Sequence, residues 1–213
     1  MYDEAIFPEE HIFSGLRKNY YNTVLSDPPW RFKTYNEKGR QRSPDWKPFK
    51  DSLSKHYDTM ETEAIAALPV AELCAPDAVL FLWICWPMLP DALALVEAWG
   101  FTYKSCAFSW MKAHAGQMDL YAEAIPVQVG MGYWTRSNSE VCLLATRGKP
   151  KRRSGNVRQG IIEPRREHSR KPDCVYERIE RLVEGPYIEL FARSTRKNWT
   201  SWGLETGKFG EVV

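Results

Sequence analysis

The chain has 213 residues, of which 44% are hydrophobic and nine are tryptophan, and its formal net charge is +2. This length fits one α/β domain with a substantial core, and the near-neutral total charge points to no class of partner by itself. The five cysteines lack C-x-x-C spacing and have no partner histidines nearby, which argues against a metal centre and against a disulfide framework.

Two features bear on the compartment. The N-terminal residues lack the positive and apolar pattern of a secretory signal. The most apolar stretch, residues 79–90, is broken by Pro87 and is too short to span a bilayer. We therefore expect a cytoplasmic protein that does not associate with membranes.

Apolar runs typical of strands alternate along the chain with helical patterns, which predicts an α/β fold with a mostly parallel sheet and helices on both faces. The predicted strands span residues 23–26, 79–85, 140–145 and 187–192, and the predicted helices run over residues 89–99, ended by Gly100, and from Pro172 to Gly185-Pro186. No repeat or linker interrupts this pattern, so we expect a single domain over residues 1–213 with its core at residues 20–205.

Two long polar loops, residues 31–56 and 112–129, interrupt the alternation. Loops of this length in a compact domain are usually functional lids or disordered. The first loop is basic, and a second basic stretch covers residues 147–171, where ten residues are Lys or Arg. Basic segments of this kind predict a surface that follows a phosphate backbone, although a solvated charged face is the alternative for either stretch.

The most informative motif is Asp27-Pro28-Pro29-Trp30, which directly follows the first predicted strand. The prolines stiffen the turn and leave its carbonyls free to accept hydrogen bonds, Asp27 adds a second acceptor, and Trp30 offers a flat face for stacking. Two acceptors beside a stacking plane suit the exocyclic amine of adenine, whose lone pair becomes available when both its hydrogens are held. The alternative is a Pro-Pro turn with a capping Asp and a core Trp.

Six stretches in a fixed order resemble the permuted adenine-N6 methyltransferase family, which includes the catalytic subunit of the eukaryotic messenger-RNA adenine methyltransferase and bacterial and phage relatives. The matching stretches are residues 26–30, 56–60, 132–134 with Ser139-Glu140, 163–173, 188–193 and 202–203. The resemblance implies a Rossmann-like, class I methyltransferase fold that is circularly permuted, so that the catalytic turn precedes the donor site. It also implies S-adenosylmethionine as the methyl donor. The permutation accounts for the absence of a G-x-G-x-x-G at the beginning of the chain, and the absence of a G-x-x-x-x-G-K leaves phosphoryl transfer without support.

By resemblance, the turn residues Asp27, Pro28, Pro29 and Trp30 are catalytic. The residues implied for the donor are Asp27, Lys171, Arg193, Ser194, Thr195, Asn198 and Glu205. Lys171 would pair with the donor's methionine carboxylate, which suits a lysine at a helix start. For three of these residues a structural role is the alternative to donor binding: Lys171 as a surface lysine, Asn198 as a turn residue and Glu205 as a solvated acid. Leu204 stands where the family commonly has a polar amide, which puts the ribose contacts in question.

The resemblance places the acceptor base or strand near the loop around Tyr133 and Trp134. The residues expected on the acceptor side are Tyr133, Trp134, Ser137, Asn138 and Glu140, with Lys149, Arg152 and Arg153 from the basic stretch for the strand. An acid that caps a strand is the alternative for Glu140. His56 and Tyr57 end the first basic loop and are expected to be structural.

Two functional hypotheses follow. The first is an adenine-specific DNA methyltransferase that uses S-adenosylmethionine, with RNA as the alternative acceptor. The second is a non-catalytic subunit that binds nucleic acid and supports a partner. Intact Asp27, Trp30, Lys171 and Arg193 favour the first. The chain has no room for a separate target-recognition domain, so we expect short or relaxed sequence specificity, with a homodimer left open.

Overall fold

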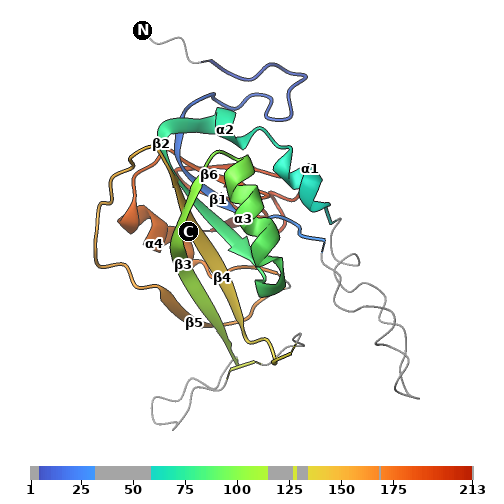
Figure 1. Ribbon diagram of the computed structural model, residues 1–213, viewed down its shortest axis with the longest axis vertical. Coiled ribbons are helices and arrows are strands. Elements are labelled where there is room, and N and C mark those ends of the chain that lie inside the picture. The colour runs from blue at the N-terminus through green and yellow to red at the C-terminus, as the bar shows by residue number, and fades with distance from the viewer. Residues whose placement is uncertain (1–4, 32–58, 115–126, 129–133, 168, 213) are drawn as a thin grey trace, which may run out of the picture.

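The computed structural model describes residues 5–31, 59–114, 127–128, 134–167 and 169–212. Its central element is a seven-stranded sheet with the strand order β5-β3-β4-β2-β1-β6-β8 (Figure 1). The strands of this sheet are β1 (Tyr21–Ser26), β2 (Cys74–Ile84), β3 (Thr102–Ala113), β4 (Ser139–Arg147), β5 (Gly160–Pro164), β6 (Tyr187–Leu190) and β8 (Trp199–Trp202). A second, two-stranded sheet joins β7 (Thr195–Arg196) to β9 (Glu211–Val212).

The central sheet is mixed. Strand β1 is parallel to both β2 and β6, and the pairs β6–β8 and β3–β5 are also parallel. Strand β4 is antiparallel to both of its neighbours, β2 and β3. The expectation of a mostly parallel sheet with crossover helices is therefore wrong around β4. No helix lies between β3 and β4 in the described chain, so the chain re-enters the sheet in the opposite direction.

Helices cover both faces of the sheet, as the sequence predicts. The helices are α1 (Thr62–Ala66), α2 (Val70–Leu73), the 3-10 turn η2 (Trp86–Met88), α3 (Leu89–Ala98) and α4 (Cys174–Leu182). Buried residues of α1, α2 and α3 form one core cluster with Val24 of β1, whereas buried residues of α4 pack with its chain neighbour Leu25 in a second cluster. Successive residues of a strand face opposite sides, so one apolar strand supplies both cores.

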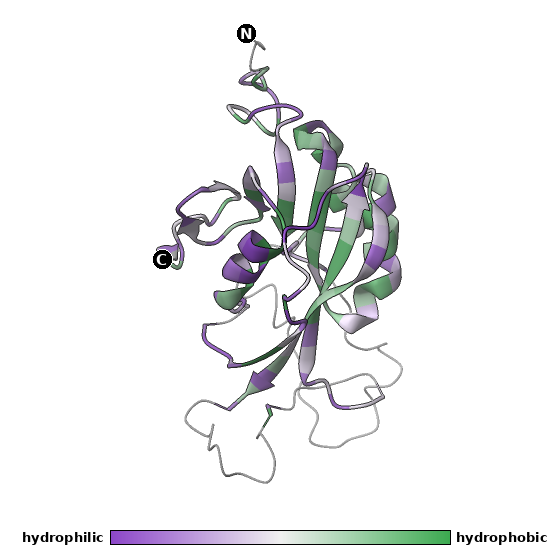
Figure 2. Cartoon of the chain, turned by 90° about the vertical axis from the view of Figure 1, so that its left-hand side faces the viewer, coloured by the Kyte–Doolittle hydropathy of each residue, from purple (hydrophilic) through white to green (hydrophobic). Residues whose placement is uncertain are grey.

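The burial of the central strands accounts for the continuous apolar run in β2, whose residues from Ala78 onward are all buried. In Figure 2 hydrophobic residues colour much of the central strands, while α4 alternates between hydrophilic and hydrophobic segments. Helix α3 ends where Gly100 takes a positive φ of 78°. The predicted strands at residues 23–26, 79–85, 140–145 and 187–192 and both predicted helices are confirmed, with ends that differ by a few residues.

Three strands of the central sheet, β3, β5 and β8, were not predicted, and neither were β7 and β9 of the small sheet. Strand β3 is mostly exposed over its first half and contains two register shifts, so it lacks the apolar alternation by which strands are recognised. Strands β5 and β8 lie at the two edges of the sheet, where polar residues are tolerated. Because β3 continues to Ala113, the predicted loop at residues 112–129 is wrong at its beginning, and residues 115–126 and the loop 32–56 lie outside the described residues.

Candidate active site

Asp27 is the centre of a group of charged side chains at the carboxyl ends of the parallel strands. It follows β1 directly, and both of its carboxylate oxygens lie 2.8 Å from the Lys171 Nζ atom. The Arg193 Nη2 atom lies 2.8 Å from Asp27 Oδ2 and also donates to the carbonyl of Ser169. The three side chains are 15–18% exposed, so the pairs are largely shielded while the group still reaches solvent.

Glu140, at the start of β4, extends this group on its other side. Its Oε2 atom lies 3.2 Å from Lys171 Nζ, and its Oε1 atom accepts a hydrogen bond from Lys112 of β3. Glu140 therefore both begins β4, as a strand-capping acid would, and pairs with two lysines. Two acids and three bases from five different segments meet here, in the order Lys112, Glu140, Lys171, Asp27 and Arg193.

This arrangement shifts the protonation equilibria of its members. Burial by itself would raise the pKa of Glu140, but Lys171 and Lys112 outweigh it and lower that pKa from 4.5 to about 2. Burial would likewise lower the pKa of Lys171, but Asp27 and Glu140 raise it above its ordinary value of 10.5. At neutral pH the Glu140 and Lys171 side chains are therefore both charged, and the group is a network of ion pairs.

The turn after Asp27 differs from the prediction in two respects. The Pro28 and Pro29 carbonyls are not free, because Pro28 accepts the N–H of Trp30 at 2.8 Å and Pro29 accepts the N–H of Met60 at 2.9 Å. Each carbonyl keeps a second lone pair. Trp30 is only 6% exposed, and its indole N–H donates to the Trp83 carbonyl. The expectation that Trp30 presents a stacking face is therefore wrong, since its ring belongs to the core.

The residues predicted to bind the donor fall into two groups: those at or beside the charged group of Asp27, and those in exposed strands, turns or ion pairs. Arg193 contacts Asp27, and Ser194 beside it is 8% exposed. Thr195 is exposed in β7, and its N–H donates to the Gly210 carbonyl. Asn198 takes a positive φ of 67° between β7 and β8, which is the conformation of a turn residue. Glu205 forms an exposed ion pair with Lys208 at 2.6 Å.

The loops that follow β6 and β8 approach each other closely. They lie at the carboxyl ends of these strands, which is the end of the sheet where Asp27 lies. Gly203 has a φ of +158°, and a Cβ atom there would lie 2.9 Å from the backbone N and O of Ala192. Only a residue without a side chain permits this approach. Phe191, next to Ala192, has a positive φ of 60°. The Ser26 hydroxyl, at the end of β1, is buried without a hydrogen-bond partner among the described residues.

The acceptor-side residues are described in part. Trp134 is 97% exposed and Ser137 is also exposed, whereas the carbonyl of Asn138 accepts the N–H of Lys112. Tyr133, His56 and Tyr57 lie outside the described residues. Of the predicted acceptor residues, the structure brings Glu140 into contact with the Asp27 group.

Comparison with known proteins gives a consistent result. Residues 21–205 match the family model described as MT-A70. The chain belongs to the MT-A70 family. It is 32% identical over 208 residues to the type II methyltransferase M.MunI of Mycoplasma sp, a match that covers 93% of this chain and 83% of that protein.

This MT-A70 protein is also similar to longer eukaryotic proteins. It is 24% identical over 214 residues to the human N(6)-adenosine-methyltransferase catalytic subunit METTL3, covering 94% of this chain and 32% of that protein. It is 26% identical over 187 residues to the N(6)-adenosine-methyltransferase MT-A70-like of Arabidopsis thaliana, covering 86% of this chain and 23% of that one. The chain therefore spans about a quarter to a third of these two relatives.

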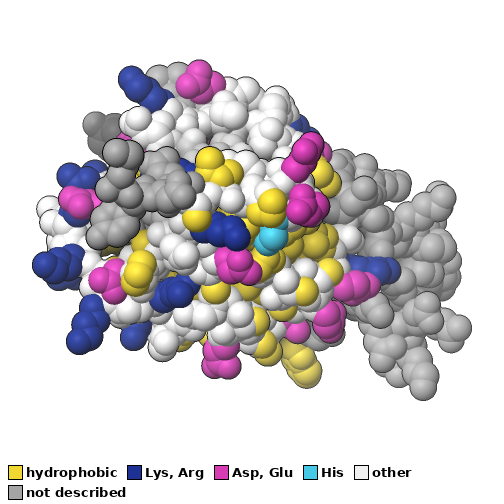
Figure 3. Space-filling model, turned by 90° about the horizontal axis from the view of Figure 1, so that it is seen from above, with side chains coloured by type: hydrophobic (Ala, Val, Ile, Leu, Met, Phe, Trp, Pro, Cys, Tyr) yellow, Lys and Arg dark blue, Asp and Glu magenta, His cyan; other side chains and the backbone are white. Residues whose placement is uncertain are grey.

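The two ends of the basic stretch at residues 147–171 of this MT-A70 protein lie in different places. Lys171 contacts Asp27, whereas residues 149–153 lie far from Asp27 and do not flank it. Lys149, Arg152 and Arg153 line a hollow with Asn22 and Asp77, which stand at the amino ends of β1 and β2. Asp27 follows the carboxyl end of β1, so the length of that strand, about 17 Å, separates the two regions. Seen from above, toward the amino ends of these strands, Lys and Arg side chains gather mainly on the left (Figure 3).

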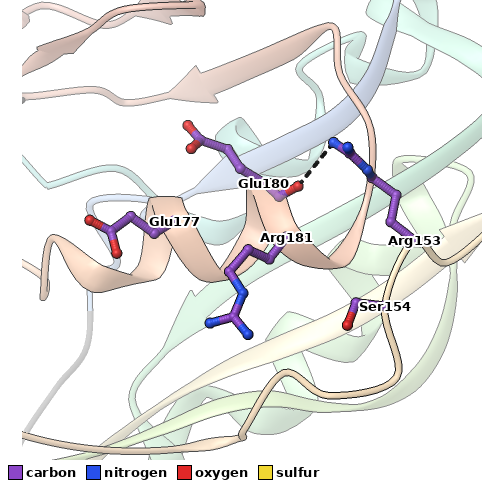
Figure 4. Close-up of a pocket in the computed structure, with 5 residues that line it drawn as sticks. All are labelled: Arg153, Ser154, Glu177, Glu180 and Arg181. Atoms are coloured by element: carbon purple, nitrogen blue, oxygen red, sulfur yellow. Dashed lines mark hydrogen bonds between the residues drawn. The ribbon is translucent and has the colours of Figure 1, made fainter.

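Arg153 has a structural role in this region. Its N–H donates to the Leu182 carbonyl and its Nη1 atom to the Glu180 carbonyl, both in the last turn of α4. Arg153 thereby satisfies carbonyls that the helix leaves unpaired at its C-terminus. The hollow beside this helix is shown in Figure 4, and its lining residues are Arg153, Ser154, Glu177, Glu180 and Arg181.

Sequence reasoning missed two participants near the site. The sequence predicts a loop at Lys112, although this residue lies near the end of a long strand and binds Glu140. For Glu189 of β6, which accepts a hydrogen bond from the Tyr176 hydroxyl at 2.8 Å, the sequence pattern predicts only a place in a strand. An acid in an otherwise apolar strand is the signal that could have identified Glu189, because buried acids need a partner.

The described residues contain no group of three or more His, Cys, Asp or Glu side chains placed to hold a metal ion. None of the helices in the described part of the chain has the length and hydropathy that a membrane crossing requires.

Proposed function

We propose that this MT-A70 protein is an S-adenosylmethionine-dependent methyltransferase that modifies the N6 amine of adenine in DNA. The observation that carries the proposal is the placement of Asp27 at the carboxyl end of β1, where Lys171 and Arg193 hold its carboxylate. Ligands of open α/β sheets bind outside the carboxyl ends of the strands. The likeness to an adenosine methyltransferase subunit and to a type II methyltransferase supports the reaction.

The residues at this edge fit the proposed donor. The methionine end of S-adenosylmethionine carries one ammonium and one carboxylate, and the group offers acids and bases for both, including Asp27, Lys171 and Arg193. Gly203 and Ala192 approach each other closely at the carboxyl ends of these strands, where the Ser26 hydroxyl has no hydrogen-bond partner among the described residues. When bound, the donor supplies an electrophilic methyl group on a sulfonium.

Asp27 is proposed to hold the acceptor amine. A carboxylate oxygen of Asp27 and the second lone pair of the Pro28 carbonyl accept the two hydrogens of the amine, which frees the nitrogen lone pair for attack. Asp27 also favours the positive charge that develops on that nitrogen. Lys171 and Arg193 fix the orientation of the Asp27 carboxylate, since both bind its Oδ2 atom at 2.8 Å.

The remaining residues predicted to bind the donor differ in how well their positions support that role. Ser194 is placed beside Arg193, and we propose that it contributes to the donor site. Thr195, Asn198 and Glu205 are exposed or engaged in turns and ion pairs, so a role at the ribose requires them to exchange these partners. On the acceptor side we propose Glu140 as a residue of the site and Trp134 and Ser137 as exposed contacts for the strand.

The chain order of the strands supports a circular permutation. Strand β1, which delivers Asp27, precedes β6 and β8 in sequence by more than 150 residues but lies next to β6 in the sheet. If β6 and β8 form the donor half of the site, as we propose, the acceptor turn precedes the donor half along the chain. We further propose that residues 20–205 form one catalytic domain.

DNA is favoured as the acceptor over RNA. The type II methyltransferase is matched over most of both chains, whereas the adenosine methyltransferases are matched over a limited part of their own length. A non-catalytic role is disfavoured, because the acid of the candidate catalytic turn, Asp27, is present and is oriented by Lys171 and Arg193. A homodimer and a cytoplasmic location remain predictions from the sequence.

One experiment tests the proposal directly. The protein is incubated with methyl-labelled S-adenosylmethionine and with parallel DNA and RNA oligonucleotides, which are then digested to nucleosides. We expect labelled N6-methyladenine from DNA. Label in RNA alone would replace DNA by RNA as the acceptor, and the absence of N6-methyladenine from both would contradict the proposed activity.

A further inference from the structure

We propose that Trp86 stacks on the acceptor base, which makes it a substrate-positioning residue of this site. The inference rests on the proposed function, since it concerns the nucleobase that Asp27 would hold. An aromatic face is required to compensate for the loss of base stacking when a base leaves a nucleic-acid strand. Trp30, the aromatic next to Asp27 in sequence, is buried and does not provide that face.

The position of Trp86 places it beside the charged group. In the parallel pairing of β1 and β2, Ser26 lies opposite Leu82, so the end of β2 runs alongside Asp27. Cys85 follows β2, and burial together with the nearby Glu140 carboxylate raises the pKa of its thiol to about 11. Trp86 is the next residue and begins the turn η2, so it stands at the rim of this group.

A hydrogen bond fixes the orientation of the Trp86 ring. Its indole N–H donates to the Ser139 hydroxyl at 3.2 Å, and Ser139 directly precedes Glu140. This bond lies at the edge of the ring and in its plane, so it restrains the side chain without occupying either face. Pro87 follows and limits the backbone conformations of the turn. Trp86 is 50% exposed, so part of its surface is accessible to solvent.

Two other tryptophans of the described chain that lie near the charged group, Trp83 and Trp110, are buried. Trp83 is 1% exposed, and the Lys171 ammonium lies 5.5 Å from its ring centroid. Trp110 is 2% exposed and donates its indole N–H to the Glu163 carbonyl. A rigid, half-exposed indole at the rim of an otherwise polar, charged group is the arrangement that base stacking requires.

The test first uses the wild-type protein to find which adenine of a DNA oligonucleotide it methylates. The fluorescent base 2-aminopurine then replaces that adenine, because stacking against an indole quenches its emission. The variants are Trp86→Leu, which removes the aromatic face, and Trp86→Phe, which keeps a smaller one. Tyr103→Leu is the matched control. Tyr103 is 44% exposed and lies at the start of β3, at the end of the sheet that is opposite Asp27.

We expect Trp86→Leu to raise the KM for the oligonucleotide about tenfold, in the range measured for one stacked base, and to abolish quenching by the protein. Trp86→Phe should recover most of the affinity, and Tyr103→Leu should match the wild type. The Kd for the donor, measured by calorimetry, should stay unchanged in all variants.

Three results would overturn the inference. These are an unchanged KM in Trp86→Leu, quenching that persists without the indole, and a loss of donor affinity and thermal stability that parallels the rise in KM, which would assign Trp86 to the fold. If the wild-type protein methylates no adenine, the proposed function fails and this inference fails with it. If the wild type is active and Trp86→Leu behaves normally, only the stacking role is rejected.

Discussion

The Lys171 ammonium lies 2.8 Å from both carboxylate oxygens of Asp27, although the two residues are 144 positions apart in the chain. Asp27 comes from the first strand of the sheet, and Lys171 precedes the last long helix. Their contact joins the predicted catalytic turn to the predicted donor side. It also means that a ligand that uses Lys171 must share it with Asp27 and Glu140.

Replacement of Asp27 tests its role as the acceptor of the amine hydrogens. We expect Asp27→Asn to lower turnover by at least about 100-fold, the scale of the effect when one transition-state hydrogen-bonding group is removed. Donor affinity should change much less. Labelled methyl transfer and calorimetry measure the two quantities, with Glu97→Gln on the exposed side of α3 as the control. Normal turnover in Asp27→Asn would remove Asp27 from the chemistry.

Lys112 is predicted to hold Glu140 in its charged form. The pKa of Glu140 is about 2 in the folded protein against an ordinary 4.5. Since this pKa is depressed, the stabilisation is complete above the ordinary value and is lost as the pH falls toward about 2. Lys112→Met should raise the pKa of Glu140 and shift acid unfolding to higher pH.

The conservative variant Lys112→Arg keeps a cation beside Glu140 and should restore the acid resistance of the wild type. Circular dichroism during acid titration follows both variants. Identical acid unfolding of Lys112→Met and the wild type would show that Lys112 does not stabilise the Glu140 carboxylate.

Glu189 should make stability fall as the pH rises. Burial and the nearby Asp27 charge raise its pKa from 4.5 to about 7, against the opposing effect of the Tyr176 hydroxyl. The folded protein therefore retains a proton that the unfolded chain has lost, so its contribution is full below the ordinary pKa and is lost as the pH rises through about 7. Glu189→Gln should flatten thermal stability between these two values, and a pH dependence equal to that of the wild type would refute this.

Gly148 is expected to be intolerant of any side chain. It has a φ of +63°, and a Cβ atom would lie 2.2 Å from Asp77 Oδ1 and 2.4 Å from the Pro76 carbonyl oxygen. Gly15 has a similar φ of +76° but nothing within 4 Å. Gly148→Ala should cost about 3 kcal/mol or more of unfolding free energy, and Gly15→Ala only the backbone strain of about 1 kcal/mol. Denaturant titration compares them, and equal losses would rule out the steric contribution.

The position of the basic residues 149–153 gives a prediction about nucleic-acid binding. Lys149 and Arg152 lie at the amino ends of the parallel strands, whereas exposed Arg136 lies four residues before Glu140. Arg136→Ala should weaken the binding of a short oligonucleotide and reduce its salt slope by about one. The double variant Lys149→Ala and Arg152→Ala should leave both quantities unchanged. Fluorescence anisotropy at several salt concentrations measures both quantities. Weaker binding by the double variant, with Arg136→Ala unchanged, would place the nucleic acid at the amino ends of the parallel strands.

The sequence by itself determined the family, the candidate catalytic turn and the most apolar strands and helices. These depend on local patterns, namely a run of specific residues such as Asp27-Pro28-Pro29-Trp30 or a repeated apolar spacing. The spacing that predicted the helix before Gly100 and the apolar run in β2 both survive in the structure.

Only the tertiary structure decided which side chains meet. The direction of β4, the pairing of Lys112 with Glu140, the burial of Trp30 and the separation of Lys149 from Asp27 all depend on strand order and on which face of the sheet a residue occupies. The interaction of Asp27 with Lys171 and Arg193 spans 144 and 166 residues. Contacts at such separations arise because burial of the apolar strands fixes the sheet, and local sequence patterns do not encode that order.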